Sequence, residues 1–254
     1  MAPPRALLAI PVFNEDRYVS RVLRRVRAYI SDILVINDGS TDRTAEVLAG
    51  EHDLYVIEHP ENRGYGKSLA ETFAFGLRHE YEWLITMDCD EQHEPAAIPD
   101  FLAAARRDEA DVISGSRYLK RFGQNSTPPA DRRAINCLIT GLLNERLGLG
   151  ITDAFCGFKA YRVAALSSFN ITVPGYAMPL QLWVQAARAG LRIVELPVRL
   201  IYRDPNRHFG GLLDDPQARL KHYLEMLNLE LSAQQTGEHA ASPSPVPTYI
   251  GCSR

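Results

Sequence analysis

The chain has 254 residues, of which 46% are hydrophobic and 23% are charged, and its net charge is −3 at pH 7. These values are typical of a soluble globular protein that is long enough to bury a substantial core in one large domain or two small ones. The charge balance provides no overall basic field, so nucleic acid is not an expected partner.

The first 118 residues alternate between apolar runs that predict strands and amphipathic stretches that predict helices. The predicted strands cover 6–12, 32–38, 54–59, 83–88 and 111–118, and the predicted helices cover 16–30, 40–50, 64–79 and 96–108. This alternation predicts parallel pairing in a doubly wound α/β sheet, in which ligands bind beyond the carboxyl ends of the strands. Asp38, Asp88 and Arg117 lie at such ends, so we expect them to meet at one edge of the sheet.

The pattern loosens after residue 118, beginning with a polar loop that contains a Pro-Pro pair. Helices are predicted over 134–148 and 177–190, and a late strand over 192–202. The last predicted helix, 214–233, carries a leucine stripe whose alternative interpretations are packing on the domain, a homodimer seam or a membrane-surface contact. Residues 235–254 are rich in Gly, Ser and Pro and are predicted to form a disordered tail.

The cysteines and the apolar segments indicate a cytoplasmic protein. The four cysteines, Cys89, Cys137, Cys156 and Cys252, include no closely spaced pair, so we expect reduced thiols rather than a disulfide or zinc framework. The apolar run at 6–10 is too short for a signal peptide, and no stretch approaches the roughly 18–20 apolar residues of a membrane span. A lipid substrate would therefore be reached at the membrane surface or beside a partner.

The sequence LITMDCDEQHEP, residues 84–95, places carboxylates and an amide just after a predicted strand. In an extended segment Asp88, Asp90 and Gln92 would share one face, because alternate side chains point the same way. Their oxygen atoms suit a Mg²⁺ or Mn²⁺ ion that keeps some water and also binds a diphosphate. The alternative interpretation is a solvated acidic loop at a strand end.

Three further residues each have two interpretations. Asp38, in NDGSTDRT, begins an Asx turn or accepts hydrogen bonds from a base or ribose. Arg117, in GSRY, forms a surface ion pair or binds phosphate with its guanidinium. Asp153, in TDAFCGFKAY, is a turn residue or a carboxylate for sugar hydroxyls. The glycine-rich segment 62–68 lacks the spacing of a phosphate-binding P-loop.

Taken together, IPVFNE, INDGSTDRT, NRGYGKSLA, MDCDEQHEP, ISGSRY, DAFCGFKAYR and LRIVELPV resemble, in order and spacing, the family-two glycosyltransferases with the GT-A fold. They are most similar to the dolichyl- or polyprenyl-phosphate mannosyltransferase branch. The resemblance implies a Rossmann-like, mostly parallel sheet flanked by helices, in a single domain over 1–234. This domain would comprise a nucleotide-binding half (1–118), an acceptor half (119–213) and a C-terminal helix (214–234).

The same resemblance implies which residues bind the nucleotide sugar. Pro11, Phe13 and Glu15 match the first nucleotide-contacting turn of the family. Ile36 and Asp38 match the second turn.

The resemblance also implies a metal and diphosphate site. Asp88, Asp90 and Gln92 match the metal site, and Cys89 contributes its backbone to nucleotide-sugar binding. Arg117 matches an arginine near the donor.

Further along the chain, Asp153 matches the acidic residue that faces the sugar, and Arg203 matches an arginine that holds the diphosphate. The branch usually has a lysine in the late loop, but here Phe209 stands at that position, so Arg207 is a candidate to replace the charge. Asp153, Asp90 and Arg117 are therefore the expected catalytic residues.

Two other departures from the family pattern concern Asn37 and Gln181. Asn37 replaces the first aspartate of the usual DDGS, and little loss is expected because Asp38 remains. Gln181 stands where the family often has an acidic base, and an amide cannot take a proton at neutral pH. One interpretation is that the acceptor is a lipid phosphate, which needs no base because it is already ionised. The alternatives are that Asp153 or another carboxylate takes over as base, or that activity is lost.

The expected function is thus an inverting, Mg²⁺- or Mn²⁺-dependent transfer of a hexose from GDP-mannose or UDP-glucose to polyprenyl or dolichyl phosphate. One alternative keeps this donor chemistry with a soluble hydroxyl acceptor. The other is a non-catalytic protein that binds nucleotide sugars or acts as a scaffold.

Overall fold

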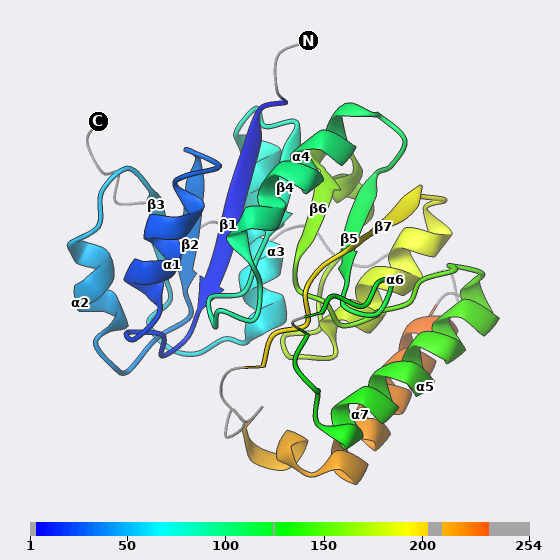
Figure 1. The fold of residues 1–254 in the computed structure, drawn as a ribbon. Helices are drawn as coiled ribbons and strands as arrows, with labels where there is room; N and C mark the ends of the chain where they lie inside the picture. The colour runs from blue at the N-terminus through cyan, green and yellow to red at the C-terminus, as the bar shows by residue number, and fades with distance from the viewer. Residues whose placement is uncertain (1–3, 124, 203–209, 234–254) are drawn as a thin grey trace.

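The computed structural model describes residues 4–123, 125–202 and 210–233 (Figure 1). The strands in the described part are β1 (Ala6–Val12), β2 (Ile33–Asn37), β3 (Tyr55–Glu58), β4 (Trp83–Thr86), β5 (Val112–Ser116), β6 (Lys159–Arg162) and β7 (Ile193–Pro197). The α-helices are α1 (Val19–Val26), α2 (Thr44–Ala49), α3 (Tyr65–Arg78), α4 (Ile98–Arg106), α5 (Ala130–Leu147), α6 (Met178–Arg188) and α7 (Pro216–Ser232). Arg203, Arg207 and the predicted tail 235–254 lie outside the described residues.

The strands form one sheet in the order β3-β2-β1-β4-β6-β5-β7. All pairs are parallel except those of β6, which runs antiparallel to both β4 and β5. The predicted mostly parallel α/β sheet is therefore confirmed, but the sequence analysis missed β6. This strand has only four residues, KAYR, and its buried Lys159 breaks the apolar pattern that marks the other central strands.

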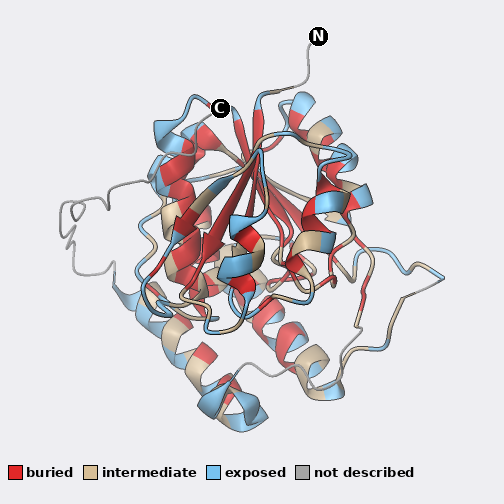
Figure 2. Ribbon diagram, turned by 90° about the vertical axis from the view of Figure 1, so that its left-hand side faces the viewer, coloured by how far each residue is buried: buried red, intermediate tan, exposed pale blue. Residues whose placement is uncertain are grey.

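Helices cover both faces of the sheet, and each face has its own apolar core. Leu7, Ala9 and Leu34 belong to the core under α3, α5, α6 and α7, whereas Leu8 and Ile10 belong to the core under α1 and α4. This division follows from the two-residue alternation of side chains along a strand. Figure 2 shows the strands buried between the two helical layers.

Several element boundaries differ from the sequence prediction. Helix α2 begins at Thr44 rather than at residue 40, and the Ser40 hydroxyl accepts the backbone N–H of Asn14 at 3.0 Å. Helix α5 begins a turn earlier than predicted, at Ala130, directly after the Pro-Pro pair. It ends as predicted at Gly148, whose φ of 66° is a left-handed conformation that favours glycine.

The leucine stripe of α7 packs on the domain. Tyr223 and Leu227 are buried in the core, and Leu220, Leu224 and Leu231 pack against it. Figure 1 shows α7 lying alongside α5, below the edge of the sheet where the parallel strands end. Of the helices in the described ranges, none combines the length and apolar composition that crossing a membrane requires. A homodimer remains a prediction.

Candidate active site

A cavity of 540 Å³ opens beyond the carboxyl ends of β1, β2, β4 and β5. Most of the residues that the sequence singled out line it: Pro11, Phe13, Glu15, Asp38, Asp88, Cys89, Asp90, Gln92 and Arg117. Ile36 does not line the cavity, because its side chain is fully buried in the core under α3. Asp153 does not line it either. As predicted, Asp38, Asp88 and Arg117 lie at one edge of the sheet, where all three line the same cavity.

The turn after β1 is fixed by hydrogen bonds to the segment after β2. Asn14 adopts a left-handed conformation with φ of 57°, and its side-chain oxygen accepts the N–H of Thr41 at 2.8 Å. The next residue, Glu15, donates its backbone N–H to the Thr44 hydroxyl at 2.8 Å. These bonds hold Phe13 and Glu15 at the cavity wall.

Asp38 organises the turn between β3 and α3. Its carboxylate accepts backbone N–H groups from Arg63 at 2.9 Å and Gly64 at 2.8 Å, and it pairs with His59 Nδ1 at 2.6 Å. The other ring nitrogen of His59 lies 2.7 Å from Glu71. The hydrogen bonds to both carboxylates raise the pKa of His59 to about 9, so the ring is charged at neutral pH. Burial alone would raise the pKa of Asp38, but these partners outweigh burial and lower it.

The segment after β4 is a compact turn, so the expectation of an extended segment is wrong. Glu91 has φ of 58°, and the N–H of Gln92 donates to Asp90 Oδ1 at 3.1 Å. Asp88, Asp90 and Gln92 nevertheless all line the cavity, because the turn directs them to the same side.

Asp88 is held closely by its surroundings. Its backbone N–H donates to His93 Nδ1 at 3.1 Å, and the Tyr65 hydroxyl donates to its carboxylate at 3.3 Å. Burial lowers the pKa of His93 to about 4, so its ring is neutral and can accept this bond. A Cβ atom at position 157 would lie 2.4 Å from the carboxylate, so any other residue there would displace the Asp88 side chain from this position.

These donors fit a small divalent cation of the kind that retains water. Within the described ranges, no three His, Cys, Asp or Glu side chains form a cluster able to hold a metal. The described residues would therefore supply at most two carboxylates and the Gln92 amide, leaving the other positions to water and phosphate. Mg²⁺ and Mn²⁺ accept such oxygen sets.

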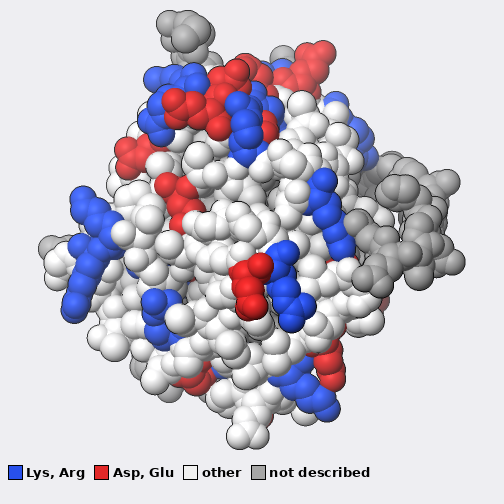
Figure 3. All heavy atoms as spheres, turned by 90° about the vertical axis from the view of Figure 1, so that its right-hand side faces the viewer, with Lys and Arg blue, Asp and Glu red and all other residues white. Residues whose placement is uncertain are grey.

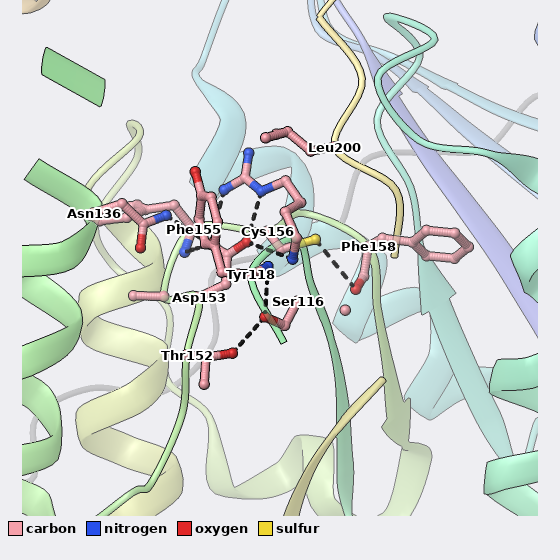
Figure 4. A network of polar contacts seen from close by, with 12 residues as sticks. Ser116, Tyr118, Asn136, Thr152, Asp153, Phe155, Cys156, Phe158 and Leu200 are labelled. Carbon is pink, nitrogen blue, oxygen red and sulfur yellow. Dashed lines mark hydrogen bonds and ion pairs between the residues drawn. The ribbon is translucent and has the colours of Figure 1, made fainter. Parts of the chain in front are cut away.

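Arg117 and Asp153 form a buried ion pair at the end of β5. The Arg117 Nε and Nη2 groups donate to the two Asp153 oxygens at 2.7 and 2.9 Å, and Asn136 on α5 donates to the same carboxylate at 2.7 Å. Figure 4 shows how Asn136 and Asp153 face each other across the network. Burial alone would raise the pKa of Asp153, but Arg117 lowers it to about 2. Asp153 thus lies behind Arg117 and holds it at the cavity wall.

The sequence analysis missed several residues on the α5, α6 and α7 side of the cavity. Arg132, Lys159 and Arg219 line it, together with aromatic side chains that include the stacked pairs Tyr65–Tyr176 and Phe155–Tyr223. Lys159 is buried, donates to the Cys156 carbonyl, and lies 5.3 Å from the Trp183 ring centroid. For these missed residues, the sequence offered one signal, which was the position of Lys159 within a largely apolar stretch.

Gln181, the residue at the expected position of a base, does not line the cavity. Its amide oxygen accepts the N–H groups of Thr172 and Val173 at 2.8 and 3.0 Å. Its amide nitrogen donates to the Thr172 hydroxyl and to Glu230 on α7. The Gln181 side chain therefore connects the loop at residues 172–173 to α7.

The sequence profile of "Glycosyl transferase family 2" matches residues 8–169. An undecaprenyl-phosphate mannosyltransferase of Micrococcus luteus is 32% identical over 83% of this chain and 90% of its own length. A polyprenol monophosphomannose synthase of Mycolicibacterium smegmatis is 30% identical over 79% of this chain and 78% of its own.

Among solved structures, glucosyl-3-phosphoglycerate synthase of Mycobacterium tuberculosis has a similar fold. Its complex with phosphoglyceric acid superposes with a TM-score of 0.66 and 19% identity, covering 90% of this chain and 80% of the synthase chain. A second structure of that enzyme, with a TM-score of 0.66 and 19% identity over 89% of this chain and 78% of its own, contains Mn²⁺, UDP and phosphoglyceric acid. Both likenesses support the GT-A architecture.

Proposed function

Because this chain belongs to glycosyl transferase family 2, we propose that it transfers a hexose from a nucleoside-diphosphate sugar to the phosphate of a polyprenyl lipid, with inversion at the anomeric carbon. It is a glycosyltransferase with polyprenyl-phosphate mannosyltransferases among its relatives. Their names support mannose, and hence GDP-mannose, as the first donor to test. The UDP in the structural neighbour makes UDP-glucose the second.

The distribution of charge around the cavity carries this proposal. Among the described lining residues, the acids are Glu15, Asp38, Asp88 and Asp90, all from the ends of β1, β2 and β4. From Arg117 onward the described lining contains cations, aromatic and aliphatic side chains and no carboxylate. A hydroxyl acceptor would need a base on that side, whereas a lipid phosphate brings its own negative charge and an apolar chain.

The donor end supplies the groups that a diphosphate leaving group requires. Asp88 and Asp90, with Gln92, would hold Mg²⁺ or Mn²⁺, and such an ion neutralises charge on the departing diphosphate when bound. From the acceptor side of the same cavity, Arg117 adds a fixed positive charge. The presence of Mn²⁺ with UDP in the structural neighbour supports this use of a divalent ion.

The acceptor end would orient the attacking phosphate. Arg117 and Arg132 both line the cavity, and Arg117 has its geometry set by Asp153. An ionised phosphate oxygen so held can attack the anomeric carbon directly, on the face opposite the diphosphate, which inverts that centre. No residue needs to remove a proton, which agrees with the structural position of Gln181.

The apolar part of the wall would accommodate the first units of the lipid. Met178, Leu182 and Ile135 lie there with the aromatic pairs. The remaining chain would stay in the bilayer, so we propose a protein that works peripherally at a membrane surface.

The test is radiolabelled transfer in detergent from GDP-mannose, and in parallel from UDP-glucose, to two matched acceptors. One is a polyprenyl phosphate, and the other is the polyprenol of the same length. The proposal predicts a lipid-linked product from the phosphate alone. Transfer to the alcohol but not to the phosphate would contradict it and would favour the hydroxyl-acceptor alternative.

A further inference from the structure

Glu91 lies between two cavity-lining residues but does not itself line the cavity. Its side chain is only 3% exposed, and its backbone is left-handed with φ of 58°. Residues with a Cβ atom rarely adopt this conformation unless their surroundings hold them there. A buried carboxylate in a strained turn, within the expected metal loop, calls for an explanation.

Two arginines on α1 form ion pairs with the Glu91 carboxylate. Arg21 Nη2 is 2.6 Å from Glu91 Oε2, and Arg25 Nη1 is 3.8 Å from Glu91 Oε1. These arginines are four residues apart, so they occupy one side of the helix. The opposite side is anchored in the core through buried residues that include Val22, Leu23 and Val26. Glu91 is therefore held by a rigid element from outside its own loop.

We propose that Glu91 is a positioning residue, whose ion pair with Arg21 fixes the left-handed turn that directs Asp90 and Gln92 to the metal. This inference rests on the proposed function, because it assigns a role in holding the divalent ion. Without the ion pair, residue 91 can relax towards an ordinary backbone conformation. The bond from the Gln92 N–H to Asp90 would then be lost, and the two ligands would no longer share a side.

The ion pair between α1 and Glu91 also links the turn after β1 to the turn after β4, the two turns that would bind the donor and the metal. Helix α1 begins four residues after Glu15, which lies at the cavity wall. The same helix holds the turn after β4 through Arg21. One short helix therefore connects the turn that carries Asp90 and Gln92 to the turn that carries Glu15, and fixes the position of one turn relative to the other.

The test measures Mn²⁺ affinity directly, from the free-Mn²⁺ signal in electron paramagnetic resonance, with and without GDP or UDP. Nucleotide affinity in EDTA is measured in parallel. We expect Glu91→Gln, Glu91→Gly and Arg21→Ala each to weaken Mn²⁺ binding by about 10-fold or more, as loss of an outer partner of a metal site does. Arg21→Lys should restore most of the affinity, and nucleotide affinity in EDTA should stay unchanged in all of them.

Arg24→Ala is the matched control, because it removes the same charge from an exposed position on the same helix. The glycine variant separates two explanations, since it permits the left-handed backbone without an anchor. Wild-type Mn²⁺ affinity in Glu91→Gly or in Arg21→Ala would overturn the positioning role. Equal losses in Arg24→Ala and Arg21→Ala would overturn it as well, because a general charge effect would then explain both. Absence of Mn²⁺ binding in the wild type would instead contradict the proposed function.

Discussion

The two sides of the cavity are built by different means. On the donor side, backbone groups of turns help to fix the side chains, as where Asp38 accepts the N–H groups of Arg63 and Gly64. On the acceptor side, side chains from distant segments fix one another, as in the pairing of Arg117 with Asp153. A hydrogen bond to a charged group, such as each of these to Asp38, contributes about 1.5–3 kcal/mol. A buried ion pair that loses one partner costs about 3–5 kcal/mol.

The face of the molecule shown in Figure 3 does not separate acidic from basic side chains as the cavity lining does. On the face shown in Figure 3, acidic and basic side chains are interspersed outside the grey atoms. The separation of acids from cations belongs to the cavity, where it distinguishes the donor end from the acceptor end.

Asp90→Ala should have the largest effect on activity, because it removes a cavity carboxylate from the donor side while leaving the acceptor side intact. We expect a loss of about 10²–10³-fold in kcat, the range found when one preorganised electrostatic contribution is removed. Steady-state transfer rates measure it. Glu145→Ala, at an exposed position on α5, is the control. Activity near the wild-type value in Asp90→Ala would show that the donor side works without this carboxylate.

Arg117→Met should affect stability most, because it leaves Asp153 buried without its cation. Chemical denaturation should show a loss of about 3–5 kcal/mol in the free energy of unfolding. The double variant Arg117→Met, Asp153→Asn should recover much of this stability while transfer remains impaired. If the two substitutions were additive in the free energy of unfolding, the pair would not be coupled as described.

His59→Gln tests the donor side through pH. The folded pKa of about 9 lies above the ordinary 6.5, so the charged ring stabilises the fold fully below pH 6.5. This stabilisation, about 2–3 kcal/mol, should disappear as the pH rises from 6.5 through 9. The difference between wild type and His59→Gln in urea unfolding should therefore shrink over that interval. A constant difference would show that His59 is not charged between Asp38 and Glu71.

Gln181→Glu should have the smallest effect on catalysis. The side chain lies outside the cavity, so a carboxylate there supplies no base, and kcat and its pH profile should not change. Stability should fall by about 1–3 kcal/mol, because the new carboxylate loses the donors of the amide and faces Glu230. A new ionisation in the pH profile of kcat would contradict this placement of residue 181.

The contrast between the two sides also explains what could be predicted from the sequence. The donor side follows the local alternation of strands and helices, so Asp38 and Asp88 could be placed at strand ends without a structure. The turn at Glu91 could not be predicted, because a left-handed residue that is held by an arginine 70 positions earlier leaves no local sequence pattern.

The acceptor side depends on contacts across long sequence separations. Strand β6 was missed because it is short and contains Lys159. The role of Asp153 was open between a turn and a sugar contact, and the structure places it behind Arg117 because Asn136 and Arg117 saturate its oxygens. The position of Gln181 was read from family spacing, which carries no information on the side-chain direction.

The most direct test of the central claim is calorimetric binding of GDP and UDP, with and without Mn²⁺, to the wild type and to Asp90→Ala. The account predicts that one nucleotide binds in a Mn²⁺-dependent manner to the wild type and that Asp90→Ala loses this dependence. Failure of both nucleotides to bind a folded wild type, or equal Mn²⁺-dependent binding by the variant, would contradict it.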